Sequence, residues 1–379
     1  MSDGLEAYGA CAGLTDGASA GAAVAYFVTA HGFGHATRAC AVMAALRARR
    51  PDLELHVFTQ APEWLFSESV PGGVSYHAAT TDVGVVQHDA LREDLPATVA
   101  RLDDLLPFDP HLVREWAAWL ARLRVELVLC DIAPLGLAVA AEAGLPGVLI
   151  ENFTWDWIYA PYVAAEPGFV RHLPRLREAF ALAPHHLQAA PVCAPDLSLT
   201  QLPPIARPPR HTRAETRAAL GLAAPERLVL VTLGGMAGAL PLPKPDAGPP
   251  DVVYVLPGAA DTAYRDGQRL ALPARGDYYH PDLIGAADAV VGKLGYSTVA
   301  EAYHAGVPFG YIPRGGFRES PVMAAFVGQH LPSLEIPAEV FTTGAWGAHV
   351  AALLAEAPRP PGGPNGADTA AEYIIKLLG

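Results

Sequence analysis

The alternation of short apolar segments with helical segments limits the fold of this chain more than any other feature. In the first half, apolar and β-branched runs predict strands at 23–29, 53–59, 125–130 and 147–150, with helical patterns at 36–49, 111–124 and 134–143. In the second half, the same features predict strands at 227–235, 251–256, 288–293 and 309–313 and helices at 281–286 and 297–305. Strands that alternate with helices build βαβ units and parallel sheets. The sequence therefore predicts an α/β fold with two doubly wound, Rossmann-like halves.

A proline-dense stretch, "TQLPPIARPPRHTRAE" at 200–215, separates the two halves, and we expect no helix or central strand in it. A chain of 379 residues also exceeds what a single hydrophobic core usually covers. We therefore expect, in chain order, a flexible tail at 1–20, a first Rossmann-like domain at 21–202, a linker at 203–213, a second Rossmann-like domain at 214–360 and a terminal helical segment at 361–379.

Composition narrows the class of protein. A net charge of −13 disfavours nucleic acid as a partner. No apolar segment is long enough to span a bilayer, and the first 23 residues carry no basic residue, so we expect no secretory signal, no membrane insertion and a cytoplasmic protein. The four cysteines show no CxxC or mixed Cys/His spacing, which predicts no metal site. A monomer or a homodimer is expected.

The stretch "VTAHGFGHATRACAVMAAL" (28–46) places two histidines around a glycine turn between the first strand and its helix. In doubly wound folds, ligands bind at the carboxyl ends of the strands, and glycines let a ligand approach the backbone. His35 is the stronger candidate for a base, whereas His31 could instead satisfy backbone groups at the strand end. Arg38 could reach a phosphate or a sugar, or could be an ordinary solvated side chain.

Asp131 directly follows the strand predicted at 125–130. A carboxylate there could orient His35 and raise its basicity. It could also cap the helix predicted at 134–143, which begins with a proline. The two roles are compatible.

A second turn, in "GKLGYSTVAEAYHAGVPF" (292–309), offers groups suited to a nucleotide. Backbone N–H groups and hydroxyls near a helix start bind diphosphates, an acidic residue one turn later can hold a ribose, and a lysine neutralises phosphate charge. The candidates are Lys293, Gly295, Ser297, Thr298 and Glu301. The spacing excludes a P-loop, because Lys293 is followed by leucine instead of serine or threonine.

Three further motifs carry weaker signals. Gly234 and Gly235 in "TLGGMAG" (232–238) could admit a phosphate or only make a tight turn. In "ENFTWDWIYAPY" (151–162), Trp155 could stack on a sugar ring or pack in the core, and Asp156 is expected to face a cleft because burying an unpaired carboxylate is costly. In "RGGFRES" (314–320), Arg314 and Glu319 could contact sugar hydroxyls.

Three of these motifs together resemble a known family. "TAHGFGHATR", "NFTWDWIYAPY" and "GKLGYSTVAEAYHAGVPF" are similar, in this order, to the glycosyltransferase-like N-terminal region of plant-type L-arabinokinases and free-standing bacterial relatives. Both halves of the chain resemble a GT-B glycosyltransferase. The resemblance implies metal-independent, inverting transfer from a nucleoside-diphosphate sugar to a small-molecule or natural-product hydroxyl. A uridine donor is favoured, with guanosine or thymidine alternatives, and no separate cofactor is implied.

The resemblance also assigns roles: it implies that the domain at 21–202 binds the acceptor and that the domain at 214–360 binds the nucleotide sugar. It makes His35 the base and Asp131 its orienting partner, and it places Ser297 and Thr298 at the diphosphate and Glu301 at the ribose. It assigns Gly234 and Gly235 to the turn that opens the second half, and it implies that the helix at 367–378 returns to the first half. "RGGFRES" departs from the acid–glutamine loop of the family. An epimerase or hydrolase on the same fold, and a non-catalytic nucleotide-sugar sensor, are the alternative functions.

Overall fold

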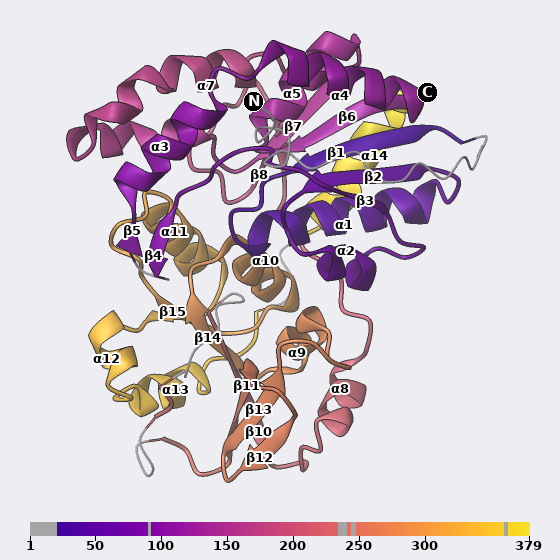
Figure 1. Cartoon of the computed structure of the whole chain (residues 1–379). Helices are drawn as coiled ribbons and strands as arrows, with labels where there is room; N and C mark the ends of the chain where they lie inside the picture. The colour runs from indigo at the N-terminus through magenta and orange to yellow at the C-terminus, as the bar shows by residue number, and fades with distance from the viewer. Residues whose placement is uncertain (1–20, 90–91, 234–240, 244–247, 360–362) are drawn as a thin grey trace. The chain divides into compact units, whose positions relative to one another are not determined.

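The chain folds into two compact α/β units (Figure 1). The computed structural model describes residues 21–89, 92–233, 241–243, 248–359 and 363–379. The first unit extends to Ile205 and also includes Asn365–Gly379, and the second comprises Ala206–Pro364. The division between the units thus falls inside the segment 203–213. The tail expected at 1–20 lies outside the described residues.

The described part of the first unit contains a seven-stranded parallel sheet with the order β3-β2-β1-β6-β7-β8-β9. Its strands are β1 (Ala23–Val28), β2 (Glu54–Thr59), β3 (Ser75–Ala78), β6 (Val125–Asp131), β7 (Gly147–Glu151), β8 (His185–Ala189) and β9 (Thr200–Leu202). Every residue of β1 is buried, which explains its continuous apolar sequence, because helices cover both faces of a parallel sheet.

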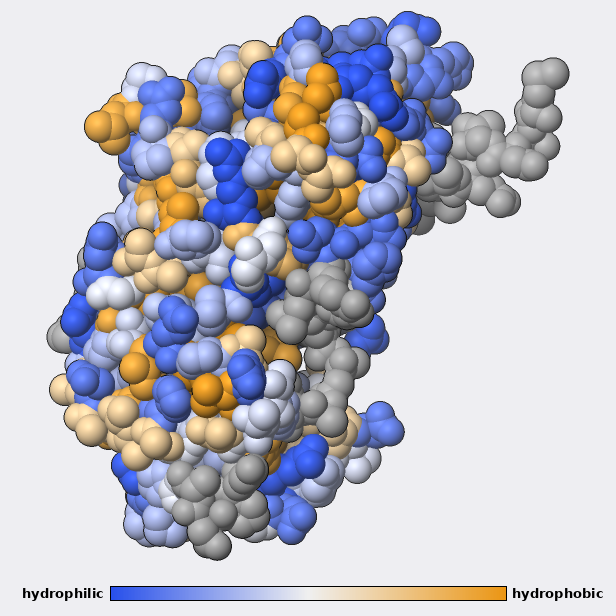
Figure 2. Space-filling view, turned by 90° about the vertical axis from the view of Figure 1, so that its left-hand side faces the viewer, coloured by the Kyte–Doolittle hydropathy of each residue, from blue (hydrophilic) through white to orange (hydrophobic). Residues whose placement is uncertain are grey.

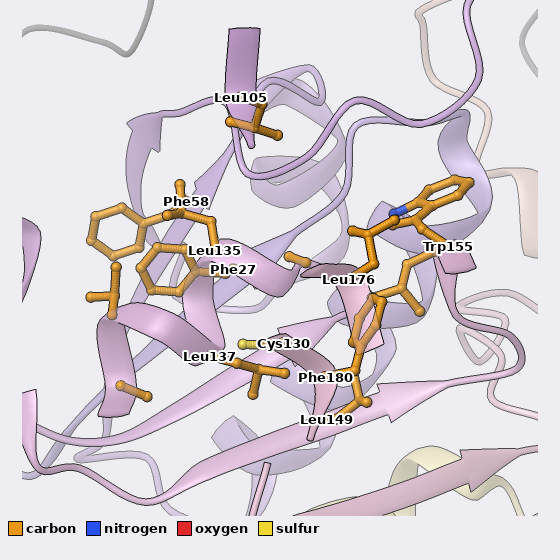
Figure 3. Close-up of a cluster of buried hydrophobic side chains, with 14 of the residues drawn as sticks. Phe27, Phe58, Leu105, Cys130, Leu135, Leu137, Leu149, Trp155, Leu176 and Phe180 are labelled. Atoms are coloured by element: carbon orange, nitrogen blue, oxygen red, sulfur yellow. The ribbon is translucent and has the colours of Figure 1, made fainter. Parts of the chain in front are cut away.

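The helices that accompany this sheet are α1 (Phe33–Arg49), α2 (Glu63–Ser69), α3 (Leu95–Leu105), α4 (Pro110–Arg122), α5 (Pro134–Ala143), α6 (Trp155–Tyr159) and α7 (Leu173–Phe180). A short separate strand pair consists of β4 (Gln87–Asp89) and β5 (Arg92–Glu93). In the core, the rings of Phe27 and Phe58 stack with centroids 4.6 Å apart (Figure 3). Trp116 of α4 packs 5.8 Å from Phe27. Side chains of neighbouring strands and of one helical layer therefore form a single apolar cluster.

The terminal helix α14 (Gly366–Leu378) packs on the first unit, chiefly on α1. Its apolar side, which includes Ala370 and Ile374, is fully buried. At the start of the helix, the Gly366 N–H donates to the Pro204 carbonyl at 3.0 Å. A Cβ on Gly366 would lie 2.1 Å from the Pro203 carbonyl oxygen, so this close approach requires glycine.

The described part of the second unit also contains a seven-stranded sheet, with the order β12-β13-β11-β10-β14-β15-β16. Its strands are β10 (Arg227–Thr232), β11 (Val252–Ala260), β12 (Tyr264–Asp266), β13 (Arg269–Pro273), β14 (Ala289–Lys293), β15 (Phe309–Ile312) and β16 (Ser333–Glu335). Only the edge strand β12 is antiparallel to its described neighbour. The helices are α8 (Arg213–Ala219), α9 (His280–Ala286), α10 (Tyr296–Ala305), α11 (Ser320–His330), α12 (Ala338–Thr342) and α13 (Gly347–Leu353).

The proline-dense stretch is more ordered than its sequence indicates. It contains the edge strand β9, and the expectation that no helix enters it is wrong at its end, where α8 begins at Arg213. Thr212 and Glu215 form a reciprocal capping box, which offsets the absence of intrahelical partners in the first turn. The N–H groups of Arg210 and His211 both donate to Asp282 of α9, so this part of the stretch is fastened to the second unit.

The surface is a mosaic of hydrophilic and hydrophobic residues on the face drawn in Figure 2. Within the described residues, no helix has both the length and the apolar character required to cross a bilayer.

Candidate functional site

The first candidate site lies at the carboxyl edge of the first sheet. Gly32 caps α1 with φ 72°, in the left-handed region that favours glycine, and α1 begins at Phe33, three residues before the predicted start. His35 therefore lies in the first helical turn, directly after β1. Asp131 is the last residue of β6, which pairs with β1, so the two side chains come from adjacent elements.

His35, Arg38 and Asp131 form a buried hydrogen-bonded cluster. The Nδ1 atom of His35 lies 2.9 Å from Oδ1 of Asp131. Arg38 donates from Nε to Oδ2 at 2.7 Å and from a terminal nitrogen to Oδ1 at 2.6 Å. We place the imidazole proton on Nδ1, where Asp131 accepts it, which leaves the lone pair on Nε2.

Burial and charge set the protonation states in this cluster. Burial lowers the pKa of His35, and Asp131 opposes this shift while Arg38 adds to it. Burial raises the pKa of Asp131, but the charge and hydrogen bonds of Arg38, with the hydrogen bond of His35, outweigh it and hold that pKa below its usual value. At neutral pH the cluster therefore consists of a neutral imidazole beside a compensated carboxylate and guanidinium pair.

Two alternatives considered for these residues are wrong. Asp131 does not cap α5, because Ala133 is the N-cap residue and no side chain caps that helix. Arg38 is not a solvated side chain, because it is 1% exposed and also donates to Oδ1 of Asn152 at 2.8 Å. The missed signal was the i, i+3 spacing of His35 and Arg38, which puts both on one face of α1. A contact of Arg38 with substrate stays a prediction.

His31 contacts the loop after β3 that carries Asp82, a carboxylate that sequence reasoning missed. The Oδ1 atom of Asp82 accepts from Thr29 Oγ1 at 2.9 Å, and its Oδ2 accepts from Trp155 Nε1 at 2.6 Å. The ring of His31 meets Trp155 edge-on, with centroids 5.4 Å apart. No local motif marks Asp82, since only the folding of this loop onto the end of β1 brings it to the edge.

The other residues of the aromatic motif have defined partners. Trp155 is 1% exposed and stacks on Tyr159, so the structure favours the core alternative for its ring. Asp156 is partly buried and forms an ion pair with Arg177 of α7 at 3.1 Å. A direct contact of either residue with sugar stays a prediction.

In the second unit, three predicted residues gather at the carboxyl edge of the sheet. Lys293 ends β14, Arg314 follows β15, and Glu319 precedes α11. Burial, with the charge of Arg314, lowers the pKa of Lys293 to about 8, and burial raises the pKa of Glu319. Gly234 and Gly235 lie outside the described residues. This edge thus concentrates two cationic side chains around one carboxyl group.

The predicted diphosphate turn leads into α10. Gly295 is the N-cap, and Ser297 and Thr298 occupy the first turn, where backbone N–H groups have no intrahelical partner. Glu301 is buried. A terminal nitrogen of Arg207 donates to its Oε1 atom at 3.1 Å, and Nδ1 of His280 lies 2.8 Å from its Oε2 atom. Both partners lie outside the predicted motif, and the ribose contact of Glu301 stays a prediction.

Among the described residues, no group of three or more His, Cys, Asp and Glu side chains is placed to hold a metal ion.

The class of fold is that of the GT-B glycosyltransferases, as predicted. The structure is similar to the glycotransferase of kitacinnamycin (TM-score 0.63, 18% identity, covering 94% of this chain and 99% of that chain). It is also similar to the calicheamicin glycosyltransferase CalG4 (0.60, 16%, 95% and 98%) and to the glycosyltransferase SnogD from Streptomyces nogalater (0.55, 20%, 94% and 99%).

In sequence, the chain is 29% identical over 355 residues to L-arabinokinase from Arabidopsis thaliana, which confirms the resemblance read from the three motifs. The match covers 92% of this chain and 34% of that protein, so the chain spans about a third of that relative's length. No protein-family model matches the chain.

Proposed function

We propose that this protein is a glycosyltransferase that moves a sugar from a nucleoside-diphosphate sugar to an acceptor hydroxyl. The observation that carries the proposal is the buried contact between His35 and Asp131 at the carboxyl edge of the first sheet. The GT-B fold supports it, and so do the printed names of the similar structures, which are glycosyltransferases. A soluble cytoplasmic enzyme, monomeric or homodimeric, with a small-molecule or natural-product acceptor, fits this proposal.

In this mechanism His35 is the general base. Its Nε2 atom takes the proton of the acceptor hydroxyl while the oxygen attacks the anomeric carbon from the side opposite the departing diphosphate, which inverts the configuration. Asp131 fixes the orientation of the imidazole and stabilises the imidazolium that forms. Because Arg38 compensates Asp131, the imidazolium is less stabilised than in an isolated His–Asp pair, and it releases its proton readily.

The second unit would bind the donor. The first turn of α10, with Ser297 and Thr298, supplies N–H groups and a partial positive charge suited to a diphosphate. Lys293 and Arg314 supply cationic charge at the same edge, which supports departure of the diphosphate without a metal ion. We favour a uridine donor, with guanosine and thymidine diphosphate sugars as the alternatives, and propose no separate cofactor.

The pH dependence of transfer follows from the protonation state of His35. The base must be neutral, and its pKa lies below the ordinary 6.5, so kcat at saturating acceptor should be flat at neutral pH. It should fall as the pH drops through the lowered pKa, below about 6.5. Initial rates measured between pH 5 and pH 8.5 test this. A decline that already begins above pH 7 would contradict a lowered pKa for the base.

A thermal-shift panel of UDP, GDP and dTDP identifies the donor nucleotide. A ligand at about 100 times its Kd stabilises the folded state by roughly 2.7 kcal/mol, so the correct diphosphate should raise the Tm by several degrees. Product analysis with the matching sugar donor then separates the alternatives. An acceptor glycoside supports transfer. Free sugar or an altered sugar indicates a hydrolase or an epimerase, and tight binding without turnover indicates a sensor.

A further inference from the structure

In the part of the chain that the structure describes, no cation compensates the charge of the Asp82 carboxylate. Its two hydrogen-bond donors, Thr29 and Trp155, are neutral, and among the described residues no lysine or arginine pairs with it. A carboxylate offers about four acceptor positions, and these two donors occupy one on each oxygen. Asp82 as a whole residue is only partly buried.

The loop that carries Asp82 is held firmly against the end of β1. Thr81 donates to the Val28 carbonyl at 3.0 Å, and the Val85 N–H donates to Nδ1 of His31 at 3.3 Å. Gly84 has φ 65°, and a Cβ there would lie 2.7 Å from His31, so only glycine lets the loop rest on that ring. Such anchoring preorganises the carboxyl group.

The same edge carries the proposed base. Phe153 packs edge-on against both His35 and Trp155, with centroid distances of 5.6 and 5.5 Å. His35, Phe153, Trp155 and Asp82 thus form a continuous series of contacts within the first unit. An acceptor with one hydroxyl at His35 and no other polar group would leave the remaining acceptor positions of Asp82 desolvated and unfilled, which a polyol would avoid.

We propose that Asp82 binds a second hydroxyl group of the acceptor, and that the acceptor is a polyhydroxylated compound such as a sugar or a cyclitol. This inference rests on the proposed function, because it takes the first unit as the acceptor side. A carboxyl group that is partly protonated at neutral pH can accept from a hydroxyl or donate to it. Burial, with the charge of Asp131, raises the pKa of Asp82 to about 7, which supports this role.

The groups around Asp82 define what its titration reports. Thr29 donates to it from the end of β1, Trp155 donates to it from α6, and the charge of Asp131 acts on it from β6. The ring of His31 packs against Trp155. Tyr159, also on α6, bonds to the loop through the Gly84 carbonyl. From α1, Arg38 and His35 act on it through Asp131.

The indole N–H of Trp155 donates a hydrogen bond directly to the carboxylate of Asp82. Its NMR resonance therefore reports both protonation and ligand binding at Asp82.

The test uses the full chain labelled with ¹⁵N-tryptophan, with the Trp155 indole signal assigned by its loss in Trp155→Phe. The signal should titrate with a midpoint near pH 7, and myo-inositol or D-glucose should shift it saturably. In Asp82→Asn the pH response should vanish and the polyol affinity should fall at least tenfold. Asp82→Glu should retain a titration with weakened polyol binding, and Glu115→Gln, an exposed carboxylate on α4, should match the wild type.

Three other outcomes would overturn the inference, and a fourth would overturn only the proposed function. A shift of the Trp155 signal with D-glucosamine but not with glucose would show that Asp82 binds an ammonium group instead of a hydroxyl. An equal shift with cyclohexanol would show that the site is apolar. No response to any polyol, with UDP bound normally in the same sample, would refute the inference and leave the proposed function standing. Loss of UDP binding and of transfer with the polyol response intact would refute the proposed function instead.

Discussion

Replacing His35 with alanine is expected to lower kcat by about 10²- to 10⁴-fold, the range over which a general base typically acts. The substitution removes the only group placed to receive the acceptor proton in the proposed mechanism. The dissociation constant of the nucleoside diphosphate should stay unchanged, because the donor residues Lys293, Ser297 and Thr298 belong to the other unit. Steady-state kinetics and calorimetric titration of the diphosphate measure the two quantities.

The matched control is His111→Ala, which removes an exposed imidazole from the start of α4 in the same unit. It should leave kcat, KM and nucleotide affinity unchanged. Full activity of His35→Ala would remove His35 from the mechanism. A loss of nucleotide affinity equal to the loss of kcat would show that His35 contributes to donor binding instead of proton transfer.

Replacing Arg38 with methionine is expected to destabilise the first unit by about 3–5 kcal/mol, because it leaves Asp131 buried without its cation. For a domain of this size, about 2–4 °C of Tm accompany each kcal/mol, so the Tm should fall by roughly 6–20 °C. Since the pKa of Asp131 is depressed in the folded protein, its ionised form contributes stability above about pH 4, which is lost as the pH falls through that depressed pKa. The cost of the substitution should therefore shrink in acid.

Two further variants separate this effect from a general loss of packing. Arg38→Met combined with Asp131→Asn should recover much of the stability, because it removes the unpaired charge. Arg50→Met, which breaks the exposed pair with Asp52, should change the Tm little. If the double variant is no more stable than Arg38→Met, charge compensation is not the reason for the loss. Thermal unfolding followed by circular dichroism provides the measurement.

The fold could be predicted from the sequence wherever strands were continuously apolar. The runs around Ala23–Val28 and Gly147–Glu151 are unmistakable because both faces of a parallel strand are buried. Short edge strands such as Ser75–Ala78 escaped prediction, because a strand exposed on one side has no continuous apolar pattern. The helix that begins at Arg213 was missed for a different reason: neighbouring prolines outweighed the Thr212–Glu215 capping signal in the reading of that stretch.

The candidate site shows the same division between local and long-range information. The position of His35 and Asp131 after two strands predicted their contact, since adjacent parallel strands end at one edge. The role of Arg38 depends on burial against Asp131, and that of Asp82 on a loop contact with Trp155 across 73 residues of sequence. The spacing of His35 and Arg38 indicates only that they share one face of a helix, and neither contact has a short motif that names its partner. The partners Asp131 and Trp155 could therefore be identified only in the folded chain.

The bond between Gly366 and Pro204 has a topological consequence. The chain leaves the first unit after Ile205 and re-enters it at Asn365, next to the point of departure, so the whole of 206–364 is an insertion into an otherwise complete sheet-and-helix body. Excising that insertion and joining the neighbouring ends through a short glycine-serine bridge would keep the last helix on α1. A simple truncation after Ile205 would instead remove α14, which packs on α1, and would expose the apolar surface of α1 that this helix buries.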